Sequence, residues 1–282
     1  MGLLFAISGA LLCVCAAAAQ KPPPRPLGIV TVLLHQFEDG PPVAAAEPFQ
    51  PGDTVFLSFQ VAGYRASESR RIHLTYRIEA ADPAGVALAE PVADAIATEL
   101  APQDKDWLPK VRYSVLVPPW AGSGSYRLRA RVRDELAGAD VTHDRNFTVR
   151  GRQVEPSPTL VVKNFRFFRS EEAAEPMPVA AYRPGDTLWA RFDITGYRLA
   201  DKNRYHVEYG IAVLRANGET LYAEPKAAEE QDSTFYPKRY VPGALSLNLQ
   251  TELARGDYTI VVTARDRVGG ETAESRQVFH VE

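Results

Sequence analysis

Apolar and polar residues alternate with a period of two through several segments of the chain. In the segment 54–61 the apolar phase carries Val55, Leu57, Phe59 and Val61. The segments 71–78, 126–133, 187–194 and 258–265 show the same alternation. This pattern is typical of strands that bury one face in an antiparallel sheet. Because no segment of useful length shows a helical period, we predict an all-β chain.

Part of this alternating pattern occurs twice in the sequence. Residues 49–64 read FQPGDTVFLSFQVAGY, and residues 182–197, which lie 133 positions further on (Gly52 to Gly185), read YRPGDTLWARFDITGY. Shorter matches follow at nearly the same spacing and include His73 with His206, Tyr126 with Tyr258, Arg133-Asp134 with Arg265-Asp266, and Phe147 with Phe279. The chain is therefore a tandem pair of homologous modules.

Each module has room for about seven short strands. We predict strands near 27–34, 53–62, 72–80, 86–89, 111–117, 124–133 and 141–149, and again near 159–168, 186–195, 205–214, 219–223, 244–250, 256–265 and 272–281. Pro-Gly-Asp at 51–53 and at 184–186 supplies a turn in each module, in which we expect the carboxylate to accept backbone N–H groups.

The last third of each module resembles a known class of domain. The segments 124–134 (GSYRLRARVRD) and 256–266 (GDYTIVVTARD), each closed by a Phe-x-Val, look like the final strands of bacterial immunoglobulin-like or fibronectin-III-like modules. The resemblance implies two tandem antiparallel β-sandwich domains and brings no active site with it. The Cys–Trp–Cys pattern of antibody domains is absent. Tyr126 and Tyr258 stand where a tyrosine corner is expected, with the hydroxyl bonded to backbone a few residues upstream.

The N-terminal segment reads as a targeting signal. A 12-residue apolar run from Leu3 to Val14 is followed by four alanines, so we expect a signal peptide at 1–19 with cleavage after Ala19. An uncleaved anchor is the alternative, although the run is shorter than the ~20 residues of a spanning helix. The remaining divisions that we expect are a proline-rich spacer at 20–26, domain 1 at 27–150, a linker at 151–158 and domain 2 at 159–282.

The composition limits the cellular location and the class of partner that we expect. Both cysteines, Cys13 and Cys15, lie in the leader, so the mature chain has no disulfide. Export without disulfides favours a periplasmic or extracellular location in a bacterium. Residues 27–150 carry 13 basic and 16 acidic side chains, and residues 151–282 carry 17 and 19, so neither half has the basic excess that nucleic acid requires.

No catalytic or metal-binding motif emerges from the sequence. His73 and His206 recur at equivalent outward positions, yet neither has a His, Cys or carboxylate cluster at ligand spacing, and we expect them to pair with neighbouring strands. The segment 122–125 (GSGS) lacks the strand-to-helix setting of a nucleophile elbow. We therefore expect no catalytic residue, no metal and no cofactor.

Two surface features are candidates for partner binding. Arg127, Arg129, Arg131 and Arg133 point to one face of a single strand in the first module only. An ion-pair ladder with acids such as Glu79 and Asp144 is one interpretation, and a surface for an anionic partner is the other. Aromatic candidates are found at Phe56, Trp107, Trp120 and Trp189. They either pack under loops or stack on sugar rings.

The two modules differ most at residues 91–109 and 225–242, which we predict to be long loops and, with the module junction, the places for recognition. The hypothesis that follows is an exported, non-catalytic binding or structural protein of the cell envelope, whose partner is another envelope or extracellular protein. The alternatives are a carbohydrate-binding accessory protein that uses the tryptophans, and a hydrolase with a site at the module junction. We expect no membrane span after signal cleavage.

Overall fold

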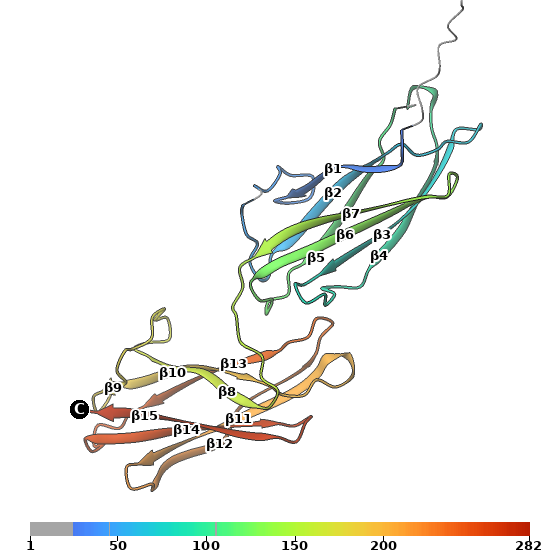
Figure 1. Ribbon diagram of the computed structural model, residues 1–282. Helices are drawn as coiled ribbons and strands as arrows, with labels where there is room; N and C mark the ends of the chain where they lie inside the picture. Colours follow the sequence, from blue (N-terminus) through green and yellow to red (C-terminus); the bar gives the residue numbers. More distant parts are fainter. Residues whose placement is uncertain (1–24, 45, 105) are drawn as a thin grey trace, which may run out of the picture.

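The computed structural model describes residues 25–44, 46–104 and 106–282. The expected signal peptide, with Cys13 and Cys15, and most of the expected spacer lie outside these residues. Among the described residues, no helix has the length and apolar character needed to cross a membrane. Figure 1 shows two β-sandwiches, connected by the segment between β7 and β8.

The first sandwich consists of seven strands in two antiparallel sheets. One sheet has the order β1-β2-β5, with β1 at Gly28–His35, β2 at Thr54–Ala62 and β5 at Lys110–Leu116. The other has the order β4-β3-β6-β7, with β4 at Val92–Glu99, β3 at Arg71–Ala81, β6 at Gly124–Asp134 and β7 at Ala139–Val149.

The second sandwich repeats this topology and adds one short strand, β9, which pairs in parallel with β15. Its smaller sheet has the order β13-β10-β8, with β13 at Tyr240–Asn248, β10 at Thr187–Thr195 and β8 at Val161–Phe168. Its larger sheet has the order β12-β11-β14-β15-β9, with β12 at Thr220–Ser233, β11 at Arg204–Arg215, β14 at Gly256–Asp266, β15 at Thr272–Val281 and the short β9 at Ala181–Tyr182. The sequence prediction of two tandem antiparallel sandwiches is confirmed, and the two short 3-10 turns at Pro102–Asp104 and Asp201–Asn203 are the only helical elements that the described residues contain.

Each sandwich buries the apolar phase of its strands in a core of its own. On β6, for example, Tyr126, Leu128 and Val132 are almost fully buried, whereas Arg127 and Arg131 between them are exposed. This alternation is the period of two that the sequence displays, since one face of each sheet packs against the opposite sheet. The two cores are separate clusters, so the modules are two sandwiches rather than one continuous barrel.

Several repeated residues have the roles that their positions predict. Asp53 Oδ2 accepts the N–H of Gln50 at 2.6 Å, and Asp186 Oδ2 accepts that of Arg183 at 2.7 Å. Tyr126 Oη donates to the Gly122 carbonyl at 2.9 Å and Tyr258 Oη to the Ala254 carbonyl at 2.7 Å. The turn prediction and both tyrosine corners are confirmed.

The repeated Gly-Tyr-Arg motif after β2 and after β10 also has a physical cause. Gly63 and Gly196 have φ of 72° and 81°, and a Cβ on either would lie about 2 Å from the carbonyl oxygen of Pro26 or Thr159. Only glycine combines a positive φ with so close an approach of the neighbouring backbone. The glycine therefore lets the chain that leaves β2 or β10 pass close to the residues that precede β1 or β8.

The fourth strand of each module is where the sequence prediction is wrong. The strand expected at 86–89 is instead β4 at Val92–Glu99, inside the segment that we expected to be a long loop. In the second module the strand expected at 219–223 continues to Ser233, through the first half of the second expected loop. β4 and β12 are edge strands that are exposed on both faces, so their sequences show no alternation.

Candidate functional site at the junction of the sandwiches

The two sandwiches meet through Tyr236, which lies in the connection between β12 and β13. Its side chain is buried and packs in the core of the first sandwich, although the residue belongs to the second. Its hydroxyl donates to Oδ2 of Asp82 at 2.9 Å. Burial, and then the hydrogen bond to Asp82, raise the pKa of Tyr236 far above its usual value, so the hydroxyl stays a donor.

A cation beside this tyrosine contacts the other side of the junction. Lys238 Nζ lies 5.6 Å from the ring centroid of Trp120, in the first sandwich, and 5.8 Å from that of Tyr205, in the second. Lys238 also forms an ion pair with Glu230, which accepts the Tyr205 hydroxyl at 2.5 Å. An ammonium group between two aromatic rings is attracted by both, and Lys238 thereby links the two sandwiches.

The connecting segment is bonded to both bodies. On the side of the first sandwich, Ser123 Oγ donates to the carbonyl of Gly151 at 2.6 Å and accepts the N–H of Gly151 at 3.0 Å. On the side of the second, Arg152 Nη2 donates to Oδ2 of the fully buried Asp193 at 2.7 Å, and Asn164 donates to the same oxygen at 2.9 Å. Only Asp193 of this pair is buried, since the Arg152 side chain is half exposed. Loss of Arg152 would leave the buried carboxylate without its cation, so this contact attaches the linker to the second sandwich.

A cavity of about 340 Å³ lies beside these contacts. It is lined from the first sandwich by Trp120, from the linker by Arg152, and from the second sandwich by Tyr236, Arg239 and Tyr240. Some polar groups at the junction are engaged with one another, as Tyr236 with Asp82 and Arg152 with Asp193, whereas the buried atoms Trp120 Nε1 and Asp193 Oδ1 have no hydrogen-bond partner among the described residues. This arrangement is suited to holding two bodies together rather than to moving protons.

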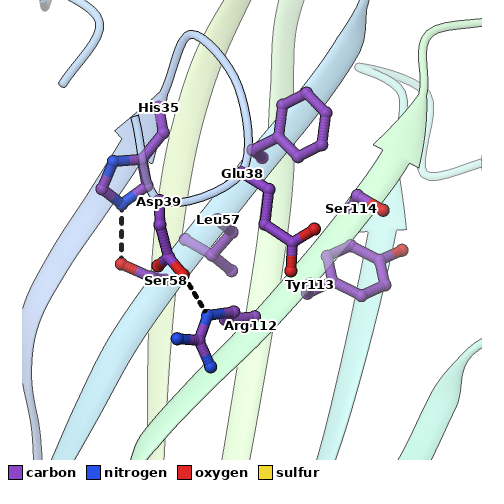
Figure 2. A pocket seen from close by; sticks show the side chains of 9 residues that line it. His35, Glu38, Asp39, Leu57, Ser58, Arg112, Tyr113 and Ser114 are labelled. Atoms are coloured by element: carbon purple, nitrogen blue, oxygen red, sulfur yellow. Dashed lines mark hydrogen bonds and ion pairs between the residues drawn. The ribbon is translucent and has the colours of Figure 1, made fainter. Parts of the chain in front are cut away.

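A smaller cavity of about 150 Å³ lies on the first sandwich, under the loop that follows β1 (Figure 2). His35 Nε2 and Ser58 Oγ are 2.7 Å apart, and His35 Nδ1 is 2.7 Å from the carbonyl oxygen of Gly40. Because a carbonyl only accepts, Nδ1 carries the hydrogen, and in the neutral ring Nε2 accepts from the Ser58 hydroxyl. No pattern in the sequence indicates this serine–histidine pair.

The second sandwich shows what this pair does. In the repeat, Phe168 stands at the place of His35 and Arg191 at the place of Ser58, and the Arg191 guanidinium lies 4.3 Å from the Phe168 ring centroid. Arg191 Nη1 donates to the carbonyl of Ala173, in the loop after β8, at 3.0 Å. Two chemically different pairs thus bond the same loop of each module to its sheet, which assigns the His35–Ser58 pair a structural role.

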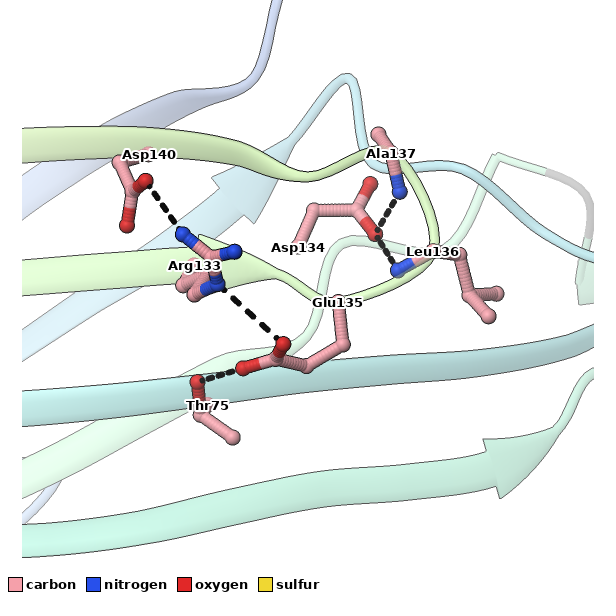
Figure 3. A network of polar contacts seen from close by, with 7 residues as sticks. All are labelled: Thr75, Arg133, Asp134, Glu135, Leu136, Ala137 and Asp140. Atoms are coloured by element: carbon pink, nitrogen blue, oxygen red, sulfur yellow. Dashed lines mark hydrogen bonds and ion pairs between the residues drawn. The ribbon is translucent and has the colours of Figure 1, made fainter.

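The arginine stripe lies on the outer face of β6, as the sequence predicts. Arg129 forms two hydrogen bonds of 2.8 Å with Asp144 on β7, which confirms the predicted ion pair. Arg133 binds Asp140 and Glu135, and Glu135 also accepts the Thr75 hydroxyl (Figure 3). Within the described part of the chain, Arg127 and Arg131 form no ion pair. Their role as a surface for an anionic partner stays a prediction.

The aromatic candidates do not form one platform. Trp107 is 41% exposed, whereas Trp120 is partly buried at the junction under Lys238. They flank the strand β5, with Trp107 before its first residue and Trp120 after its last, so they lie toward opposite ends of that strand. Phe56 and Trp189 are partly buried, each beside the loop after the first strand of its sandwich.

One cluster in the second sandwich has the residue types of a metal site. Ligand atoms of His206, Glu208 and Glu229 lie within 4.8 Å of one another. The buried Glu208 is paired with Arg267, which lowers the pKa of its carboxyl, and Glu229 Oε2 lies 2.5 Å from Lys226 Nζ. These cations already compensate the carboxylates, so the cluster is an ion-pair network on the sheet surface. The pairing expected for His206 is confirmed by its 3.3 Å contact with Glu229.

The sequence indicates the junction as one of the regions for recognition, but it does not indicate which residues form the contacts there. Tyr236, Lys238 and Arg152 lie outside the repeated motifs, and the first two of them lie in a segment that we expected to be a loop. Asp193 lies inside a repeated motif, but at a position where the first copy has Gln60. The available signal was their difference from the first module at places where the scaffold is otherwise copied.

No family model and no curated protein matches this sequence. The chain is similar in structure to the C-terminal domain of the Streptococcus agalactiae AgI/II polypeptide BspA, with a TM-score of 0.32, 12% identity, and coverage of 90% of this chain and 100% of that one. It is also similar to the C-terminal domain of the Streptococcus pyogenes antigen I/II-family protein AspA, with a TM-score of 0.33, 10% identity, and coverage of 91% and 100%. Red sea bream transglutaminase matches with a TM-score of 0.29 and 11% identity, over 93% of this chain and 32% of that one. Similarities this low do not transfer a function, which has to be argued from the residues of the chain.

Proposed function

We propose that the chain is an exported, non-catalytic binding or structural protein of the cell envelope, whose two immunoglobulin-like sandwiches are held at a fixed angle. The observation that carries the proposal is the insertion of Tyr236 into the core of the first sandwich, where it binds Asp82. A mere tether between independent modules needs no such contact. The fixed angle gives one continuous scaffold on which loops of both modules face a partner together.

The linker supports the same function. An eight-residue proline-bearing linker alone restricts the angle between two modules without fixing it. In this chain Arg152 and Gly151 bond that linker to Asp193 on one side and to Ser123 on the other. Three independent attachments, the linker, Tyr236 and Lys238, therefore oppose rotation of one sandwich against the other.

The angle is testable by spin-label distance measurements. Because residues 25–282 contain no cysteine, labels can be placed at the exposed sites of Thr142→Cys and Thr272→Cys without removing a native thiol. We expect a narrow distance distribution that broadens in the Arg152→Ala/Tyr236→Ala variant. The neighbouring Phe235→Ala, at a 49% exposed side chain, is the matched control and leaves the distribution narrow. A broad distribution in the unchanged protein contradicts the proposal.

The partner is then sought with the same pair of proteins. The unchanged chain and the loosened variant are immobilised and exposed to an envelope extract of the native host. A partner that fits a fixed two-module surface is retained by the first and lost from the second. Recovery of no stable partner, together with a narrow distance distribution, leaves a purely structural role.

The glycan-binding alternative depends on Trp107, the one tryptophan of the candidate set that is more than one third exposed. Glycan-array binding that disappears in Trp107→Ala, but persists in Trp189→Ala, supports this alternative. An array without signal removes it. For the hydrolase alternative, no histidine is found among the described residues that line the junction cavity.

A further inference from the structure

The strand β4 is an open edge of the larger sheet in the first sandwich. It pairs with β3 on one side through a ladder without register shift, from Arg71 opposite Glu99 to Ile78 opposite Val92. Its other side has no neighbour among the described strands. Seven of its eight residues are exposed, and Ile96 is partly so. An edge of this kind presents unpaired N–H and C=O groups on which another strand can form a ladder.

The equivalent edge of the second sandwich is protected. β12 contains Pro225 and Lys226, and its ladder with β11 shifts register between Tyr209 and Ile211. Proline, lysine and bulges are the devices by which proteins prevent pairing of edge strands.

Most other edges carry one of these devices as well. Register shifts interrupt the ladders of β1 and β8, Pro242 lies within β13, and β5 exposes Lys110 and Arg112. Along β7, Phe49 forms a parallel bridge with Val149. The sequence of β4, VADAIATE, has no proline, lysine or bulge.

The side chains of β4 are compatible with pairing to the same strand of a second copy. In an antiparallel pair centred on Ile96, Asp94 lies opposite Thr98 and Glu99 lies opposite Ala93. When the pair is centred on Ala95, Asp94 lies opposite Ile96. Neither register places like charges opposite each other, and the small alanines avoid steric conflict. An antiparallel pair of identical strands also satisfies two-fold symmetry, which closes the assembly at two chains.

We infer that β4 is an interaction edge that pairs, antiparallel and about a two-fold axis, with β4 of a second copy of this chain. The pairing joins the two four-stranded sheets into one continuous sheet. It uses a surface distinct from the junction of the two sandwiches, so it stands independently of the proposed function.

One backbone group permits a clean test. The N–H of Ala95 is bonded to the carboxylate of the preceding residue, Asp94 Oδ1, at 2.7 Å. Pairing through this N–H has to replace that bond. Ala95→Pro removes this donor, while Ala95→Ser keeps it and is the matched control. Analytical ultracentrifugation over a range of concentrations should show a dimer for the unchanged chain and for Ala95→Ser. For Ala95→Pro we expect a dissociation constant weaker by about tenfold or more.

A thiol at the predicted axis reports the register directly. Since the only cysteines of the chain are Cys13 and Cys15, residues 25–282 carrying Ile96→Cys have a single thiol. This thiol should form an intermolecular disulfide on mild oxidation when the pair is centred on Ile96. Asp140→Cys, on the opposite edge strand β7, is the control and should not. Unchanged thermal unfolding verifies that each variant is folded. A chain that stays monomeric and forms no disulfide overturns the inference. So does a dimer that Ala95→Pro does not weaken. Pairing of β4 with a strand of a different protein, and not with a second copy, also overturns it.

Discussion

The hydroxyl of Tyr236 lies 2.9 Å from Oδ2 of Asp82, although the two residues are 154 positions apart and belong to different sandwiches. Asp82 is held for this contact, because its other oxygen, Oδ1, accepts the N–H groups of Ala84 and Val86 at 2.8 Å. The acceptor thus lies in a turn of the first sandwich, and the donor lies in a loop of the second.

A double-mutant cycle should measure this contact. Tyr236→Phe removes the donor, Asp82→Asn replaces the charged acceptor, and we expect a coupling free energy of about 1.5 kcal/mol because hydrogen bonds to charged groups exceed neutral ones. The measurement is denaturant unfolding of the four proteins. Phe235→Leu at the exposed neighbouring position should leave the unfolding free energy within about 0.5 kcal/mol. A coupling near zero would mean that Tyr236 contributes only by burial of its ring.

The tyrosine corners offer a matched pair of substitutions. Tyr126→Phe and Tyr258→Phe each remove one hydroxyl that donates to a carbonyl four residues upstream. We expect each to lower the unfolding free energy of its own sandwich by about 1 kcal/mol, since an acceptor loses its partner. Hydrogen exchange is the suitable measurement, because it reports the stability of each sandwich separately. An effect of Tyr126→Phe on the second sandwich alone would contradict the assignment.

These corners also show what a sequence can reveal of this fold. Tyr126 and Tyr258 are predictable because they lie at the start of strands in which apolar and polar residues clearly alternate. When a strand buries one face, this alternation determines which residues face the core and therefore its register. The same physics explains the failure at β4. Both faces of β4 are exposed, so burial imposes no period on its sequence, and its pairing with β3 is made by backbone groups that every residue has.

The candidate site was predictable only as a region. Tyr236 is an aromatic residue in a segment without periodicity, and its burial depends on contacts with Asp82 and the first core that no local pattern encodes. Asp134 was visible as part of a repeated Arg-Asp pair, but the repeat itself does not tell whether the pair is exposed. In the structure Arg133 faces solvent and Asp134 is fully buried (Figure 3).

Alkaline pH should destabilise the second sandwich in a defined window. Burial raises the pKa of Tyr182 from 10.0 to about 12. A pKa that is higher in the folded state means that the folded chain holds this proton more tightly than the unfolded chain does. The stability from this difference is complete below pH 10, and it decreases as the pH rises through about 12.

Tyr182→Phe tests this window, because phenylalanine cannot ionise. Denaturant unfolding measured between pH 9 and pH 12 should show a shallower loss of stability in the variant than in the unchanged chain. Tyr222→Phe, at an exposed tyrosine of β12, is the control and should keep the slope of the unchanged chain. Equal slopes in all three proteins would show that Tyr182 does not contribute to the alkaline transition.

Substitutions of the buried aspartates Asp134 and Asp266 should cost more stability than substitutions of exposed acidic residues. Asp134 accepts the N–H groups of Arg65, Leu136 and Ala137 at distances between 2.6 and 3.1 Å. Asp134→Ala leaves these donors without an acceptor inside the protein, which costs about 3 kcal/mol of unfolding free energy. Asp134→Asn keeps one acceptor oxygen, and we expect it to lose roughly half as much.

The second sandwich repeats this test, because Asp266 accepts the N–H groups of Arg198 and Val268 at 2.8 Å. Asp266→Ala should therefore destabilise the second sandwich as Asp134→Ala destabilises the first. Asp144→Ala is the control, since it removes a carboxylate from an exposed ion pair with Arg129 and should cost less than about 1 kcal/mol. If both exposed and buried substitutions cost the same in denaturant unfolding, the repeated Arg-Asp pair does not stabilise the loops that it contacts. A larger loss at the buried sites identifies the aspartate as the reason why this pair occurs in both modules.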